Sequence, residues 1–241
     1  MTDLEFARRN LLLAGLPDDD LRLLLDEGVA IDLELGTVLF EPGQPVEAVH
    51  FPLTGVISLV TDLGDGLVVE AVTVGNEGMS GLSVFLGAGT PTERGTVQVS
   101  GQGLVVSAPA LQRLAREGGP LYVMLRRYTQ VMMSHLARNT ACNRAHTVQQ
   151  RAARWLLTTA DRMDSPVFEL TQHFLAQMLA VRRATVSNVA AGLAAAGCIS
   201  YSRGTIVILD RAALQDHACS CYQVVRDATE RALTTREPAT S

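Results

Sequence analysis

The 241-residue sequence predicts an α+β protein, in which an N-terminal antiparallel β-roll precedes a long helix and a mainly helical C-terminal part. The first observation is a series of short apolar runs between Ile31 and Ser107, separated by Gly and Pro. Such runs are typical of strands in a small antiparallel barrel or jelly roll. The second observation is an apolar stripe after Pro120 that repeats at steps of four and three residues, which is typical of a long helix.

The N-terminal part is expected to begin with a helix over residues 18–28, because three acidic residues precede an apolar face of Leu21, Leu24 and Leu25. Pro and Gly are concentrated in 41–45, which predicts a turn. The clearest predicted strands are Val38–Phe40, Ala48–Phe51, Val56–Val60, Leu67–Val74 and Thr96–Val99.

The predicted long helix runs from Pro120 to about Ala145, because Pro is well tolerated in the first turn of a helix. Its heptad-like stripe is most simply the seam of a homodimer, and the alternative is a helix packed only on its own domain. The stripe consists of Leu121, Leu125, Tyr128, Met132, His135, Asn139 and Cys142. We therefore predict three parts: a roll over 1–118, a dimerisation helix over 119–146 and a C-terminal domain over 147–241.

Charge is distributed unevenly along the chain. Residues 1–118 hold 6 Arg and 17 acidic residues, whereas residues 119–241 hold 14 Arg and 8 acidic residues, within a net charge of −5. An acidic front half and a basic back half suggest an effector domain joined to an anion-binding domain. The acidic N-terminus and the lack of a long uncharged apolar stretch lead us to expect a cytoplasmic protein without a membrane partner.

Residues 169–197 have the pattern of a helix-turn-helix. Thr171 can cap a first helix that faces inward through Phe174, Leu175, Met178 and Leu179. A tight connection over 180–182 leads to a second helix with an apolar set at spacings of three and four, which ends at Gly197. That set is Val186, Val189, Ala190 and Leu193.

The opposite face of the second helix is polar and begins with positive charge. A recognition helix presents its first residues to base edges in the major groove, where Arg reads guanine and Asn reads adenine. Two short β-runs around Arg203 and Gly204 predict a wing. The predicted DNA contacts are Thr171, Gln172, Arg182, Arg183, Thr185, Ser187, Asn188 and Arg203.

These residues resemble the Crp/Fnr superfamily of transcription regulators over nearly the whole chain. The resemblance rests on Leu170-Thr171, on 183–188, on Arg203-Gly204, and on Gly36, 41–43, Gly55 and 75–81 in the roll. It implies a cyclic-nucleotide-binding-like roll and a homodimer that binds a palindromic operator. RNA polymerase is the implied protein partner.

The chain departs from the cyclic-nucleotide-binding members of that superfamily in two elements. Their Gly-Glu-Leu-(Gly/Ala) element, whose Glu binds the ribose hydroxyl, here reads Gly78-Met79-Ser80-Gly81. A thioether cannot replace that charged acceptor. Their Arg-(Ser/Thr)-Ala element here reads Arg94-Gly95-Thr96. The candidate effector pocket is thus Met79, Ser80, Gly81, Arg94, Gly95 and Thr96, with an unidentified small molecule other than cAMP, or none, as effector.

The recognition helix departs as well. Receptor-like members carry Arg-Glu-Thr-Val-x-Arg, and here Ala184 and Asn188 replace the Glu and the last Arg. We therefore expect a different operator.

Other chemistry has weaker support. No Cys precedes Cys142, which argues against the N-terminal iron–sulfur cluster of oxygen-sensing members, and His50, His135 and His146 are interpreted as packed or exposed side chains rather than haem ligands. His217, Cys219 and Cys221 are locally rich in metal ligands but lack a fourth, so we expect ordinary thiols, with no metal site and no cofactor. Metal binding and redox sensing are the alternatives. No catalytic motif is complete, and we predict no enzyme.

The sequence therefore predicts a homodimeric, sequence-specific DNA-binding regulator. The alternative is a nucleotide-sensing module that regulates a protein partner, with the winged helix serving as an interaction surface.

Overall fold

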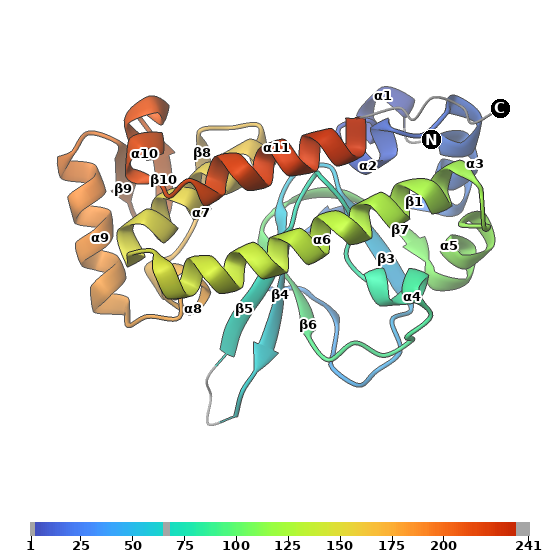
Figure 1. The fold of residues 1–241 in the computed structure, drawn as a ribbon, viewed down its shortest axis with the longest axis horizontal. Helices are drawn as coiled ribbons and strands as arrows, with labels where there is room; N and C mark the ends of the chain where they lie inside the picture. The colour runs from blue at the N-terminus through green and yellow to red at the C-terminus, as the bar shows by residue number, and fades with distance from the viewer. Residues whose placement is uncertain (1–2, 65–67, 235–241) are drawn as a thin grey trace.

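A computed structural model describes residues 3–64 and 68–234 of the chain and shows an α+β fold. The expected roll comes first, followed by one long helix and a C-terminal winged helix-turn-helix (Figure 1). No helix in these described ranges has the length and apolar character needed to cross a membrane.

Two antiparallel sheets form the described part of the roll. One has the order β1-β7-β3 and the other β2-β6-β4-β5. The strands are β1 (Gly28–Leu33), β2 (Val38–Phe40), β3 (Ala48–Pro52), β4 (Val56–Asp62), β5 (Val68–Val74), β6 (Arg94–Val99) and β7 (Gly101–Ser107). The predicted strands are all present, and β1 follows the first predicted helix directly, three residues before Ile31. Leu67, the expected first residue of β5, lies outside the described residues.

Short helices close the roll at one end. They are α1 (Leu4–Ala7), α2 (Leu11–Ala14), α3 (Asp18–Glu27), α4 (Leu82–Leu86) and α5 (Ala108–Leu114). Leu21 and Leu24 of α3 are fully buried, as its apolar face predicts. Asn10 caps α2, and its Nδ2 donates to the carbonyl oxygens of Pro52 and Gly78 at 2.8 and 2.7 Å. This buried amide therefore ties the N-terminal helices to the loop that follows β5.

The long helix α6 (Pro120–Ala145) has the predicted bounds, but its apolar stripe does not face outward. Six stripe residues are buried within the single chain: Leu121, Leu125, Tyr128, Met132, His135 and Cys142. The seventh, Asn139, donates to the Ala71 carbonyl oxygen of β5 at 3.1 Å. The interpretation of these residues as a dimer seam is therefore wrong. A heptad-like spacing shows only that one helix face is buried, and here the chain itself covers that face.

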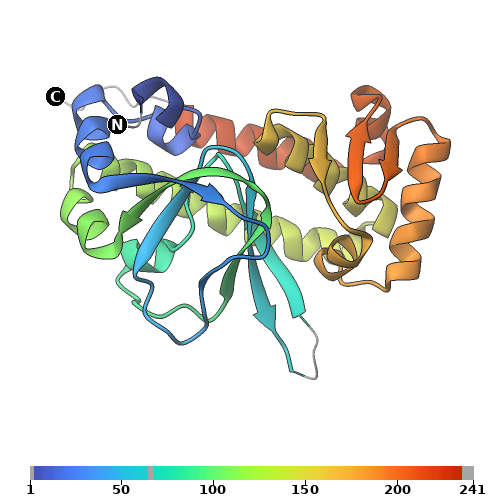
Figure 2. The ribbon, with the colours of Figure 1, turned by 180° about the vertical axis from the view of Figure 1, so that it is seen from behind.

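The winged domain begins with α7 (Val148–Met163), which Thr147 and Gln150 start with a reciprocal capping box. It continues through β8 (Val167–Glu169), α8 (Gln172–Met178), α9 (Arg183–Ala195), β9 (Ile199–Ser202), β10 (Thr205–Ile208) and α10 (Arg211–His217). The wing is a three-stranded sheet of order β8-β10-β9, because β8 adds to the two predicted strands. Seen from behind, this domain lies at one end of the molecule beside the roll (Figure 2).

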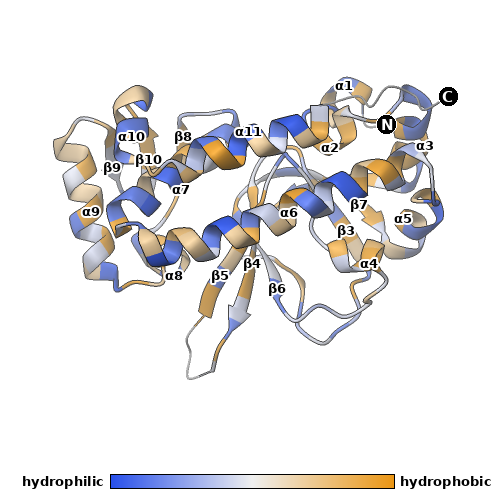
Figure 3. Ribbon diagram, in the orientation of Figure 1, coloured by the Kyte–Doolittle hydropathy of each residue, from blue (hydrophilic) through white to orange (hydrophobic). Residues whose placement is uncertain are grey.

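A last helix, α11 (Cys221–Thr234), was not predicted and runs back toward the roll beside α6 (Figure 1). Its Leu233 is buried in the same apolar core as Leu13 of α2 and Met124 of α6. Hydrophobic and hydrophilic stretches alternate along both helices (Figure 3), so that each has a face to bury. The C-terminal helix therefore packs across the predicted domain boundary.

Candidate nucleic-acid interface and its junction with the roll

The helix-turn-helix is built around two short helices that share an apolar face. Thr171 caps α8, and its Oγ1 accepts the Phe174 N–H at 3.2 Å. The connection passes through Ala180, which has a positive φ of 50°, before α9 starts at Arg183. Three of the four predicted apolar residues of α9 are buried, namely Val186, Ala190 and Leu193. The fourth, Val189, is only partly buried. This packing sets the direction in which the other face of α9 points.

That other face presents most of the predicted contact residues to solvent. Arg182, Arg183 and Asn188 are exposed, while Thr185 and Ser187 are partly exposed. The Ser187 Oγ donates to the Gln172 Oε1 at 2.8 Å, which connects the first turns of the two helices.

The wing brings a third element to the same place. Arg203 and Gly204 form the turn between β9 and β10, and Arg203 has a φ of 50°. The Gly204 carbonyl oxygen accepts the Leu170 N–H at 2.7 Å, which holds the turn beside the start of α8. A hollow of about 570 Å³ is lined by Thr171, Gln172, Arg183, Tyr201, Arg203 and Gly204.

The positive charges on this surface are not neutralised by acidic side chains of the described residues. In the parts of the chain that the structure describes, Arg182, Arg183 and Arg203 form no salt bridge. Side chains of α8, α9 and the wing thus converge on one exposed cationic surface. An exposed guanidinium group without a carboxylate partner is a ready donor to phosphate or to guanine.

The predicted effector-pocket residues have dissimilar surroundings. Met79 is fully buried in the core of the roll. Arg94 is about half-exposed, and its Nε donates to the Glu41 carboxylate at 2.7 Å. A side chain at Gly95 would collide with the Phe40 ring, which covers that position.

The other members of the set make local contacts. The Ser80 Oγ lies 3.4 Å from the His50 Nδ1, Gly81 has a positive φ and precedes α4, and the Thr96 Oγ1 donates to the Thr37 carbonyl oxygen.

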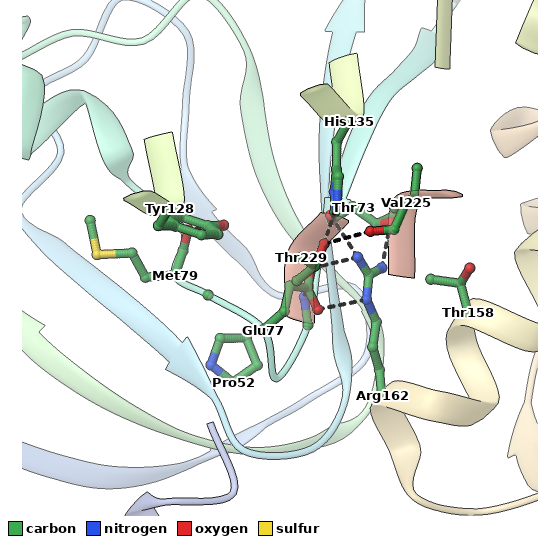
Figure 4. Close-up of polar contacts among 12 residues, drawn as sticks. Pro52, Thr73, Glu77, Met79, Tyr128, His135, Thr158, Arg162, Val225 and Thr229 are labelled. Carbon is green, nitrogen blue, oxygen red and sulfur yellow. Dashed lines mark hydrogen bonds and ion pairs between the residues drawn. The ribbon is translucent and has the colours of Figure 1, made fainter. Parts of the chain in front are cut away.

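The junction between the roll and the winged domain is a buried ion pair that the sequence did not reveal (Figure 4). Arg162 of α7 donates from Nε and Nη2 to both carboxylate oxygens of Glu77, at 3.0 and 2.6 Å. It also donates to the Thr73 hydroxyl and carbonyl oxygens at 2.5 and 3.0 Å. Both charged side chains are more than nine-tenths buried. This fork-like pairing positions α7, and with it the helix-turn-helix, on the loop over 75–81.

The loop over 75–81 is shaped for these contacts. A Cβ at Gly75 would lie 2.2 Å from the Arg162 side chain, and a Cβ at Gly78 would lie 1.9 Å from the Tyr128 ring. The Tyr128 hydroxyl donates to the Met79 carbonyl oxygen at 2.9 Å. Glycine at both positions therefore lets α6 and α7 approach the same short loop (Figure 4).

Electrostatics of the junction follow from burial and from this pairing. Burial alone would raise the pKa of the Glu77 carboxyl, but the charge and hydrogen bonds of Arg162 outweigh it and hold that pKa below its ordinary value. Burial lowers the pKa of the nearby His135 imidazole to about 4, against the opposing effect of Glu77. His135 is therefore neutral near pH 7, and its Nε2 lies 2.9 Å from the Thr229 Oγ1 of α11.

Comparison with known proteins places the C-terminal part. A family model described as a Crp-like helix-turn-helix domain matches residues 150–217. These residues form a Crp-like helix-turn-helix domain. No curated protein sequence gives a significant match to the chain.

Solved structures extend the likeness from the Crp-like domain to the fold of most of the chain. FixK2 from Bradyrhizobium japonicum is 16% identical, with 80% of this chain and 98% of that chain covered and a TM-score of 0.66. A transcriptional regulator of the CRP family from Thermus thermophilus is 20% identical, with 78% of this chain and 96% of that chain covered and a TM-score of 0.65. The regulator CLP from Xanthomonas campestris is 15% identical, with 80% of this chain and 100% of that chain covered and a TM-score of 0.64. The chain therefore has the fold of the Crp/Fnr-type transcription regulators.

The junction can be tested by removing one partner of the ion pair. Arg162→Met leaves the Glu77 carboxylate buried without its cation, so we expect the free energy of unfolding to fall by about 3–5 kcal/mol. Adding Glu77→Gln removes the unpaired charge and should restore much of that loss. Urea unfolding of both variants measures the difference, and a double variant as unstable as Arg162→Met alone would contradict the pairing.

The pH dependence of stability tests the burial of His135. Its pKa is lower in the folded chain than the unfolded value of about 6.5, so its contribution is complete above pH 6.5 and is lost as pH falls from 6.5 towards 4. Between pH 7.5 and 4.5, the free energy of unfolding measured in urea should therefore fall by about 2–3 kcal/mol less in His135→Gln than in the wild-type protein. An equal loss in the two proteins would show that His135 does not titrate in this window.

Proposed function

We propose that the chain is a homodimeric transcription regulator that binds a palindromic DNA operator through α9 and the wing. The observation that supports this most directly is the exposed, unneutralised cationic surface of Arg182, Arg183 and Arg203 on a Crp-like helix-turn-helix. In this assignment Arg183 and Asn188 contact base edges, whereas Thr171, Gln172 and Arg203 contact phosphates. RNA polymerase is the proposed protein partner of the bound dimer.

The proposed dimer uses the outer face of α6. Met133 and Leu136 have exposed fractions of 62% and 41%, and they lie on the part of the helix surface that the buried stripe leaves open. Pairing two such helices about a two-fold axis would bury these apolar side chains. Binding to a palindromic operator would then require the two copies of α9 to lie about one turn of DNA, roughly 34 Å, apart.

Regulation through the roll is proposed to involve an effector other than cAMP, or none. Met79 lies in the core where the cyclic-nucleotide-binding members carry a Glu, and Arg94 is already paired with Glu41. CLP is described as responsive to c-di-GMP, and its likeness to this chain does not carry that ligand over. The Glu77–Arg162 contact offers a direct route from the roll to α7.

Base recognition by Arg183 gives the first test. Arg183→Ala should weaken binding to a selected operator by about 1–3 kcal/mol and relax the preference at one position of each half-site. Arg203→Ala should weaken binding to all sequences and reduce the salt dependence by about one counterion. Fluorescence anisotropy at several salt concentrations measures both effects.

The control for both variants is Arg22→Ala, which removes an exposed Arg of α3 that is far from this surface in the sequence. Unchanged operator affinity of Arg183→Ala would exclude the base contact. It would favour the alternative of a regulatory module that acts on a protein partner.

The dimer face gives the second test. Met133→Glu places a charge in the proposed seam and should shift the protein from dimer to monomer in sedimentation-velocity experiments. Leu63→Glu is the matched control, because Leu63 is 63% exposed and lies beyond the end of β4. Dimers of undiminished stability in Met133→Glu would rule out this face.

A further inference from the structure

Four side chains with metal-binding atoms meet where α6 ends and α11 begins. Cys142 and His146 come from the end of α6, Cys219 lies in the turn between α10 and α11, and Cys221 is the first residue of α11. Their ligand atoms all lie within 4.8 Å of one another. The Cys142 and Cys219 sulfurs are 3.5 Å apart, and the Cys221 sulfur is 3.7 Å from the His146 Nδ1.

The separations of 3.5 and 3.7 Å match the coordination of a single tetrahedral ion, and a bound of 4.8 Å keeps all four ligand atoms near one point. Zinc binds sulfur at about 2.3 Å and imidazole nitrogen at about 2.0–2.1 Å, which places neighbouring ligand atoms about 3.5–3.8 Å apart. An iron–sulfur cluster divides its protein ligands among several irons and therefore needs a wider set. The 3.5 Å sulfur–sulfur distance is also far longer than the roughly 2.05 Å of a disulfide bond.

The backbone explains how a set that is scattered in sequence comes together. Cys142 and His146 are four residues apart, one helical turn, and the His146 N–H donates to the Cys142 carbonyl oxygen. A turn in which the Tyr222 N–H donates to the Cys219 carbonyl oxygen lets Cys219 and Cys221 face the same point. The three thiols are buried and the imidazole is partly exposed.

The sequence-based set differed from this one. His217 was the third candidate ligand in the sequence, but its Nδ1 lies 3.1 Å from the Gln149 Nε2, outside the cluster. Cys142 and His146 supply the ligands that the segment over 217–221 lacks. The expectation of no metal site rested on that shortage.

The charges around the cluster suit a thiolate site. Zinc with three thiolates and a neutral imidazole carries a net charge of −1. The charge of Arg154 on α7 acts on the Cys142 and Cys219 sulfurs, and that of Arg138 acts on Cys221. The Arg154 Nε is buried and, within the described residues, has no hydrogen-bond acceptor. Nearby arginines stabilise the thiolate form that a metal requires.

We propose that Cys142, His146, Cys219 and Cys221 bind one zinc ion in a closed structural site. All four positions of the tetrahedron come from the protein, which is the arrangement of structural rather than catalytic zinc. His146 is the C-cap of α6, immediately before α7 begins. The ion thus fastens α11 to the bend that leads from the long helix to the Crp-like domain.

Metal content of the full-length protein tests the site. Protein purified under reducing conditions, with no affinity tag and no chelator, should contain about one zinc ion per chain by mass spectrometry of the elements. Cys142→Ser, Cys221→Ser and His146→Ala should lose most of it. Cys198→Ser and His217→Gln are matched controls outside the cluster and should keep it.

A second measurement on the wild-type chain does not depend on the folding of variants. After removal of metal with a chelator and reductant, added Co²⁺ should produce the visible absorption of a tetrahedral thiolate site and saturate at about one equivalent. Zinc should then displace Co²⁺ and raise the Tm, because an ion that binds only the folded chain stabilises it.

Three results would overturn the proposal. They are wild-type protein without stoichiometric metal that also takes up no Co²⁺, equal metal loss in Cys198→Ser, or a stoichiometric metal other than zinc.

Discussion

The buried contact between Arg162 and Glu77 is the constraint on which the arrangement of the two halves depends. Burying two charges is costly, and the cost is offset only when the geometry is good and the remaining donors are satisfied. Here the guanidinium group meets both carboxylate oxygens and both oxygens of Thr73. An apolar contact could hold α7 against the roll in several registers, whereas the two parallel hydrogen bonds between Arg162 and Glu77 form in very few of them. The pair therefore orients the Crp-like domain more than it adds stability.

The loop over 75–81 explains how the roll and the recognition surface can be coupled. It carries Glu77, its Gly75 admits Arg162, and its Met79 carbonyl oxygen holds Tyr128 of α6. Residues 78–81 of this loop resemble the element that contacts the nucleotide in the cyclic-nucleotide-binding Crp/Fnr regulators. A displacement of this loop would move the partners of α6 and α7 together, which is the physical requirement for communication between two sites.

Packing beside this contact reinforces the arrangement. Val56 and Val99 of the roll belong to the same apolar core as Leu156 and Phe168 of the winged domain. The Ser58 hydroxyl also lies 3.5 Å from the Met178 sulfur of α8. At the other end, α11 packs on α6 and brings Thr229 to His135. The helix-turn-helix is thus held by the roll and by the C-terminal helix, not by the end of α6 alone.

Local chemistry in the sequence determined the elements themselves. The predicted strands, the bounds of α6, the cap at Thr171, and the residues that face solvent on α9 follow from periodicity, capping and turn residues that act over a few positions. Only the tertiary structure decided what each face meets. The stripe of α6 is buried inside the chain. Arg162 binds Glu77, which is 85 residues away in the sequence, and Cys142 contacts Cys219, which is 77 residues away. A periodic pattern records that a face is buried, whereas its partner depends on how distant segments pack, and no local spacing encodes that.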